Sequence, residues 1–226
     1  MKRFWTDVDV ADGEVRLDGR PLRTPRRQPL ALPTPALADA VAAEWRAVED
    51  SVDPRRLPLT GLANAAIDIV APDPAGFAAG LARYGESDLL AYRAESPAEL
   101  VARQAAAWDP LLDWLRRRYD VHVSVTAGVM HCAQPPATVA RLREAVAAHD
   151  PFVLAGLSPI VTIGGSLVAA LALVDGAAAA PALWDAVTLD ERWQEERWGE
   201  DALATRAREA RRAEWDAAAR FLALLG

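Results

Sequence analysis

The spacing of hydrophobic and polar positions changes near residue 60, and each side of this boundary predicts a different kind of structure. Before it, short alternating runs are separated by turn dipeptides. Asp-Gly pairs at 12–13 and 18–19 flank an alternating run at 14–17, which is typical of antiparallel hairpins. With further strands expected at 4–10 and 29–32, the pattern predicts a small β meander.

One helix is expected to close this first part. Thr34-Pro35 supplies a capping hydroxyl followed by proline at the first helical position, which is a strong helix start. The helix is expected to end before Asp53-Pro54. Its apolar positions recur every three or four residues and lie on one face: Leu37, Val41, Trp45 and Val48.

From residue 60 onward the pattern is almost wholly helical. Pro110 is expected to kink or restart the helix that begins at residue 97, and Gly199 to separate the last two helices. The alternating run at 121–125 is the exception, and it is a candidate strand that returns to the N-terminal sheet. The expected helices cover residues 62–70, 97 to beyond 108, 136–149, 159–174, 181–198 and 200–225.

These patterns predict an α+β fold. Residues 1–60 form a small N-terminal antiparallel β-rich domain with one helix, and residues 61–226 form a larger all-α helical bundle. If the run at 121–125 rejoins the first sheet, the first domain is discontinuous. The composition fits a folded protein, because 52% of the residues are hydrophobic and 25% are charged.

Charge, cysteine content and the lack of a targeting segment narrow the class of protein. A formal net charge of −7, without a basic stripe, argues against nucleic-acid binding. The single cysteine, Cys132, excludes an internal disulfide framework and fits a reducing compartment. No apolar leader opens the sequence, and the longest apolar stretch, 151–174, is interrupted and too short to cross a bilayer. A cytoplasmic protein is therefore expected.

Signals for catalysis, metals and cofactors are weak. No histidine among His122, His131 and His149 lies four residues from another ligand, so no metal site is predicted. The helix start at 163–166 contains Gly164-Gly165 and could hold an anion, but it lacks the lysine of a P-loop and the third glycine of a dinucleotide site. Close helix packing through glycine is the favoured interpretation. We predict no catalytic residue and no cofactor.

The segment at 189–201 is chemically unusual. It contains six acidic residues, two arginines and two tryptophans, and its charge of −4 is more than half of the chain's −7. If one helix runs from Pro181 through this segment, it has two faces. One is an ordinary buried stripe of Ala182, Ala186, Leu189 and Trp193. The opposite, mixed face carries Trp184, Val187, Glu191, Gln194 and Trp198.

Two interpretations of the mixed face stay open. A solvent face rarely carries two tryptophans and a core face rarely carries an unpaired glutamate, which favours a contact surface for a partner. Alternatively, it is a second packing face on which a buried arginine satisfies Glu191. The adjacent Asp190 and Glu191 diverge by about 100° on a helix, so they do not share one substrate easily.

Other polar residues are notable for their apolar surroundings, and structural roles are favoured for them. Asn64 and Asp68 are four residues apart on one helix, where a capping or inter-helix hydrogen bond is expected. In the segment that begins at Asp88, either Tyr92 or Arg93 is a candidate partner for a buried carboxylate. The remaining two, Gln104 and Trp108, precede Pro110 on the expected kinked helix.

Four blocks occur in one order along the chain: residues 16–25; residues 58–60 with 62–68; residues 88–94 with Gln104 and 108–112; and Asp190-Glu191 with Gln194 and Trp198-Gly199. Together they resemble one protein family, the assembly chaperones of the catalytic F(1) head of F-type ATP synthase that bind the free α subunit. The resemblance spans nearly the whole chain.

The resemblance implies a non-enzymatic chaperone that holds the new α subunit transiently until the β subunit replaces it, and that is monomeric by itself. Glu191 matches the acidic position most closely tied to function, with Asp190 as the alternative if the register shifts by one. Gln194, Trp198 and Trp184 complete the expected partner-binding face. Mitochondrial members carry a leader that this chain lacks, which fits a bacterial version.

Two other classes of protein remain as alternatives. One is a hydrolase-like enzyme that uses Glu191 in a cleft, which would require convergent polar groups around a concave pocket. The other is a permanent structural or regulatory subunit.

Overall fold

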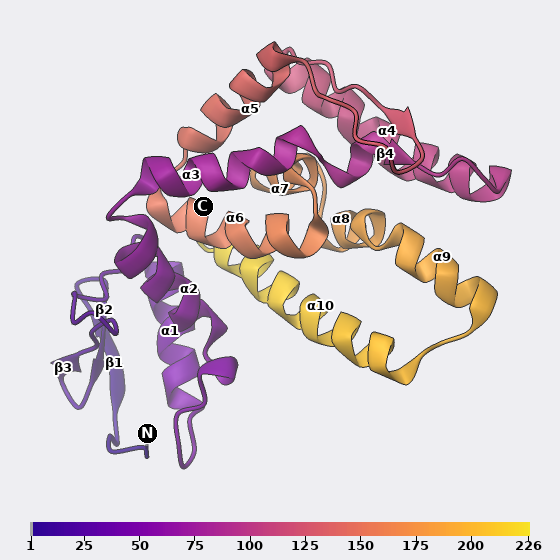
Figure 1. Cartoon of the computed structure of the whole chain (residues 1–226). Coiled ribbons are helices and arrows are strands. Elements are labelled where there is room, and N and C mark those ends of the chain that lie inside the picture. The colour runs from indigo at the N-terminus through magenta and orange to yellow at the C-terminus, as the bar shows by residue number, and fades with distance from the viewer. Residues whose placement is uncertain (1) are drawn as a thin grey trace. The chain divides into compact units, whose positions relative to one another are not determined.

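The computed structural model describes residues 2–226, which form two compact units (Figure 1). Unit 1 comprises the residues up to Pro74 together with Asp150–Gly156 and Ala217–Gly226. Unit 2 comprises Ala75–His149 and Leu157–Asp216. A small sheet with helices in unit 1 and a mostly helical unit 2 confirm the α+β prediction.

Unit 1 contains a three-stranded antiparallel sheet in the order β1 (Val8–Ala11), β2 (Glu14–Leu17), β3 (Arg20–Pro21). The two Asp-Gly turns have positive φ at both residues, the geometry that tight hairpins require. The expected strand at 29–32 forms only isolated bridges, such as Glu14 with Ala31. The hairpin prediction is confirmed, and the outer strands are shorter than expected.

The helix start at Thr34 is confirmed. The Oγ1 atom of Thr34 accepts a hydrogen bond from the Leu37 backbone N–H at 3.1 Å, and α1 (Pro35–Arg46) follows. Its apolar face packs into a core that includes Trp5, Val15 and Phe221.

A second helix, α2 (Pro58–Ala65), packs against α1 and continues into a π-helical turn, η2 (Ala66–Val70). The short 3₁₀ turn η1 (Pro54–Arg56) precedes it. The carboxylate of Glu44 accepts hydrogen bonds from the backbone N–H groups of Leu59 and Thr60 at the start of α2. Residue 60, near which the domain boundary was expected, lies inside α2. The whole of α2 belongs to unit 1, whose first segment continues to Pro74.

Asp68 is buried, and its carboxylate makes neither the helix cap nor the inter-helix hydrogen bond that was expected, because its partners lie in a non-helical segment. Its carboxylate accepts hydrogen bonds from the Thr24 hydroxyl at 2.7 Å and the Arg26 backbone N–H at 3.0 Å, which tie residues 24–26 to η2. The hydrogen bond expected of Asn64 is not made by its side-chain oxygen, which is buried without a partner within residues 2–226.

From residue 74 onward the chain is mostly helical, and the predicted helices differ mainly in their breaks. No helix within residues 2–226 is both long and apolar enough to cross a membrane. The elements are α3 (Pro74–Ala82), η3 (Arg83–Glu86), η4 (Leu89–Ala91), β4 (Tyr92–Arg93), α4 (Ala98–Tyr119), β5 (Thr126–Ala127), α5 (Pro136–Ala147), α6 (Pro151–Gly164), α7 (Leu167–Val174), α8 (Ala180–Val187), α9 (Leu189–Trp198) and α10 (Ala202–Ala223).

Of the two outcomes expected at Pro110, the restart is absent, because α4 runs through this residue. Two other helix predictions need correction. The helix expected at 159–174 is two helices, because Gly165 has a φ of 63° and Ser166 caps α7. The helix expected at 181–198 divides at Thr188, whose hydroxyl donates a hydrogen bond to the carbonyl oxygen of Trp184. The break at Gly199 is confirmed, with a φ of 90°.

The strand expected at 121–125 is absent, and this segment lies in unit 2. Its backbone groups form hydrogen bonds with side chains and not with a neighbouring strand. The side-chain amide of Gln134 bonds both the N–H and the carbonyl oxygen of Ser124, each at 2.9 Å. The hydroxyl of Thr138 likewise bonds the N–H and the carbonyl oxygen of His122. The strand that follows, β5, pairs in parallel with β4, so the chain does not return here to the N-terminal sheet.

Candidate partner-binding site

Asp88 joins two separate sequence blocks of unit 2. Its buried carboxylate accepts hydrogen bonds from the Leu90 N–H at 3.0 Å, the Ser166 hydroxyl at 2.8 Å and the Val168 N–H at 2.9 Å. The N-terminus of α7 thus binds a carboxylate of the chain itself. Of the two glycines, Gly164 fits the favoured interpretation of close packing, since a Cβ there would lie 3.0 Å from the Trp215 ring, whereas Gly165 supplies a positive φ of 63°.

Burial raises the pKa of Asp88 to about 6, although the three donors oppose this shift. Because the pKa is higher in the folded chain than in the unfolded chain, protonation favours folding. This contribution to stability is complete below pH 3.8 and is lost as the pH rises through about 6.

We therefore expect the unmodified chain to gain about 1 kcal/mol of unfolding free energy, relative to an Asp88→Asn variant, when the pH falls from 7 to 5. Other carboxyl groups titrate alike in both proteins, so the difference isolates Asp88. Urea unfolding at the two pH values measures it. A difference that stays constant or shrinks on acidification would show that Asp88 is ionised at both pH values.

Gln104 and Trp108 connect α4 to the acidic segment and to α8. The buried amide of Gln104 accepts a hydrogen bond from the Ala94 N–H at 2.8 Å and donates one to the Asp190 carboxylate at 2.7 Å. The indole N–H of Trp108 donates to the carbonyl oxygen of Ala186 at 2.8 Å. Both residues therefore have structural roles, as expected.

The expected partners of Tyr92 and Arg93 were partly wrong. Arg93 does bind a carboxylate, that of Asp109 at 2.7 Å, but the Asp109 side chain is 60% exposed. The guanidinium of Arg93 also stacks on the Trp108 ring, 5.1 Å from its centroid. The hydroxyl of Tyr92 lies 3.3 Å from Nδ1 of His131, so the partner found for it is an imidazole.

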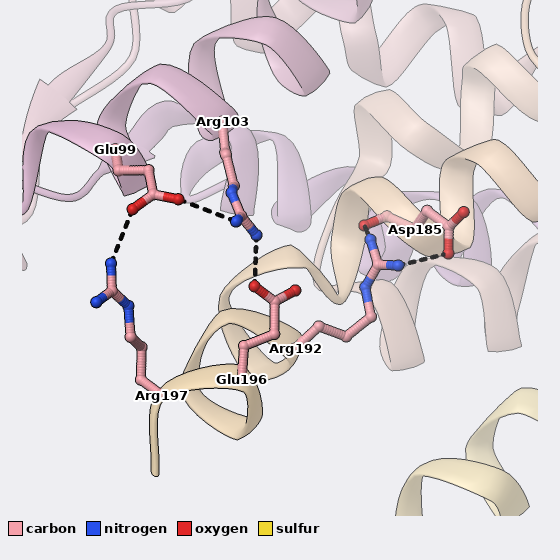
Figure 2. A network of polar contacts seen from close by, with 6 residues as sticks. All are labelled: Glu99, Arg103, Asp185, Arg192, Glu196 and Arg197. Atoms are coloured by element: carbon pink, nitrogen blue, oxygen red, sulfur yellow. Dashed lines mark hydrogen bonds and ion pairs between the residues drawn. The ribbon is translucent and has the colours of Figure 1, made fainter. Parts of the chain in front are cut away.

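Helix α9 is held to α4 by a network of ion pairs (Figure 2). Arg103 on α4 contacts Glu196 on α9 at 2.7 Å, and Arg197 on α9 contacts Glu99 on α4 at 2.8 Å. Glu99 also pairs with Arg103 at 3.0 Å, which links these two ion pairs into one network. The guanidinium groups of Arg103 and Arg197 each lie 4.6 Å from the centroid of the buried Trp193 ring.

Helix α10 holds the other acidic residues of α9. One nitrogen of Arg211, Nη2, lies 2.7 Å from both carboxylate oxygens of Glu191, and Arg208 pairs with Glu195. Glu191 is therefore satisfied by an arginine, as one of the two interpretations required. That arginine is not buried, because its side chain is 40% exposed.

The two predicted faces change because of the break at Thr188. Leu189 and Trp193 are buried as expected, but Ala182 is exposed. Trp184 is only 5% exposed, since its ring packs edge-on against Trp215 with centroids 5.5 Å apart. It therefore does not share an exposed face with the α9 residues.

The residues that remain open to a partner are fewer than predicted. Gln194 is exposed, and Trp198 is 77% exposed. Asp190 and Glu191 are half-buried and hydrogen-bonded within the chain. Trp184 instead lines a hollow of about 340 Å³ beside Arg208 and Arg212.

Sequence reasoning missed the arginines that bind the acidic segment, although a signal for them exists. Glu191 and Glu195 are four residues apart, and Arg208 and Arg211 are three apart on the next helix. Two helices joined by a short turn run antiparallel, so these spacings place the acidic and basic rows opposite each other. Within residues 2–226 no group of three or more acidic, histidine or cysteine side chains is arranged to hold a metal ion.

A comparison with known families identifies the chain. The profile of the ATP12 chaperone protein matches residues 2–116. The chain belongs to the ATP12 chaperone family. This match ends within α4, so α9 and α10 depend on comparison with solved structures.

The solved structures of ATP12 proteins are similar over the full chain. The crystal structure of Atp12 from Paracoccus denitrificans is 44% identical in sequence, with a TM-score of 0.94 over 100% of this chain and 98% of that one. An aspartate-to-lysine variant of the same protein matches equally well. A candidate chaperone from Agrobacterium tumefaciens is 39% identical, with a TM-score of 0.94 over 100% of this chain and 86% of that one.

Proposed function

We propose that this chain is an assembly chaperone for the F(1) head of F-type ATP synthase. It binds the free α subunit transiently and shields the surface that faces β until β associates. The observation that carries the proposal is the full-length similarity to ATP12 proteins, which extends through the acidic helix α9.

The physical need for such a chaperone is clear. An α subunit without its neighbour exposes apolar surface that β would bury, and surfaces of this kind aggregate. Tryptophan supplies a large apolar contact area, and acidic residues speed encounter with a basic partner. The segment at 189–201 combines both properties.

The contacts of Glu191 weigh against the enzyme alternative. Both oxygens of its carboxylate are hydrogen-bonded to Arg211, and this pairing favours the ionised, anchored carboxylate of a structural ion pair. A permanent structural subunit would instead remain in the finished ATP synthase, which separates that alternative from a chaperone.

Purified components test the proposal. We expect the immobilised chain to retain the isolated α subunit, but neither the isolated β subunit nor the assembled head, because in the head β already covers the surface. Retention of β as strong as that of α, or no retention of α, would contradict the proposed function. Presence of the chain in purified, complete ATP synthase would support a permanent subunit instead.

A further inference from the structure

All four acidic residues of α9 are already bound within unit 2. Asp190 accepts a hydrogen bond from Gln104, and Glu191 pairs with Arg211. Glu195 pairs with Arg208, and Glu196 with Arg103. A basic client side chain that approached these carboxylates would meet groups that an internal partner already satisfies in part. The acidic residues of α9 are therefore poorly placed as the first contacts with a client.

The same ion pairs fix the turn that follows α9. Glu191–Arg211 and Glu195–Arg208 join α9 to α10, so the two helices lead into and out of a constrained turn (Figure 1). Gly199 ends α9 with a φ of 90°, and the Asp201 carboxylate accepts a hydrogen bond from the Leu203 N–H at 2.8 Å at the start of α10. A surface that is already ordered loses less entropy when it binds.

This turn exposes two large apolar side chains beside two acidic ones. Trp198 is 77% exposed and Leu203 is 73% exposed, on either side of Gly199. Glu200 is within electrostatic reach of Arg208, whose pKa it helps to raise, without a close ion pair in the described residues 2–226, and the Asp201 carboxylate accepts from the Leu203 backbone N–H. Arg206, further along α10, offsets one of these charges and leaves the turn net negative.

We propose that Trp198, Glu200, Asp201 and Leu203, the α9–α10 turn surface, form the part of this chaperone that touches its client. The client surface that fits it is apolar and bordered by basic side chains. Glu191 is a positioning residue that acts through Arg211 by holding α9 against α10. This inference rests on the proposed function, because it assigns a contact surface to the binding of the unassembled α subunit.

The first test measures the dissociation constant for purified α subunit. We expect the double variant Trp198→Ala/Leu203→Ala to bind at least about tenfold more weakly, since exposed apolar anchors dominate interfaces of this kind. Its melting temperature should stay unchanged, because both side chains are exposed. The matched control is Val129→Ala/Met130→Ala, which removes two equally exposed apolar side chains elsewhere in unit 2 and should bind normally.

A double-mutant cycle tests the role of Glu191. If Glu191 acts through Arg211, Glu191→Gln, Arg211→Gln and the double variant all weaken binding by the same factor. Arg211→Lys should stay within about twofold of the unmodified chain, because one nitrogen of Arg211 makes both contacts and a lysine nitrogen can replace it. Factors that multiply in the double variant would overturn the positioning role and make Glu191 a client contact.

The outcomes separate this inference from the proposed function. If the unmodified chain does not bind α, the proposed function fails and the turn surface fails with it. If the unmodified chain binds and the Trp198→Ala/Leu203→Ala variant binds equally well, only the turn surface is overturned. Weakened binding by the Val129→Ala/Met130→Ala control would also overturn it, because any exposed apolar pair would then serve.

Discussion

Replacing Trp108 by alanine should lower the unfolding free energy of the helical unit by about 3–5 kcal/mol. The indole is fully buried in α4, and its N–H donates to the Ala186 carbonyl oxygen on α8. The guanidinium of Arg93 also loses the ring on which it stacks. Alanine therefore leaves a large cavity and removes a side-chain hydrogen bond at the junction of two sequence blocks. Urea unfolding followed by circular dichroism measures the change.

A Trp108→Phe variant separates the two contributions. Phenylalanine keeps a six-membered ring but removes the pyrrole part of the indole with its N–H donor, so we expect a smaller loss, of about 1–3 kcal/mol. If Trp108→Ala costs less than about 1 kcal/mol, the ring does not hold α8 against α4. If the Phe and Ala variants are equally destabilised, the hydrogen bond alone accounts for the effect.

Replacing Asp88 by alanine should cost about 3–5 kcal/mol, even though burial of this carboxylate is itself unfavourable. Alanine leaves three donors without an acceptor: the backbone N–H groups of Leu90 and Val168 and the hydroxyl of Ser166. The residues that carry these donors are buried. Thermal and urea unfolding of the variant measure the cost.

The control for this prediction is Ser166→Ala. This change removes one donor to Asp88 and the hydroxyl oxygen that accepts the hydrogen bond of the Ala169 N–H at the start of α7. A cap loss of about 1–2 kcal/mol is expected. A smaller loss for Asp88→Ala than for Ser166→Ala would mean that Asp88 contributes little beyond the cap.

The parts of the fold that could be predicted from the sequence are those set by local geometry. Positive φ at the Asp-Gly turns fixes the hairpins, and the Thr34 hydroxyl fixes the start of α1. Gly199 stops α9 for the same reason. In each case the residue type itself supplies the conformation or the hydrogen bond, so no distant partner is needed.

The errors arose where distant side chains decide the local structure. Val121 to Val125 alternate like a strand, but Gln134 and Thr138 take the backbone groups that a strand would have used. Asp88 similarly secures a start of α7 at Ser166, within the helix expected at 159–174. The partners lie 10 to 80 residues away along the chain, beyond the reach of periodicity.

The candidate site shows the same limit. The composition at 189–201 identified the acidic segment. The break at Thr188 separates α8 from α9, so Trp184 does not lie on one helical face with the α9 residues and is buried. The arginines that satisfy the segment lie on α4 and α10, so its carboxylates appeared free when only their own helix was considered. The exposed Leu203 lay outside the segment.

The central claim, that this chain protects the unassembled α subunit, is tested most directly by light scattering of purified α at a temperature where it aggregates. We expect an equimolar amount of the chain to suppress the scattering, and later addition of β to release α into assembled heads. The Glu191→Gln variant should protect less well. Unchanged aggregation of α, with the unmodified chain and the Glu191→Gln variant behaving alike, would contradict the account.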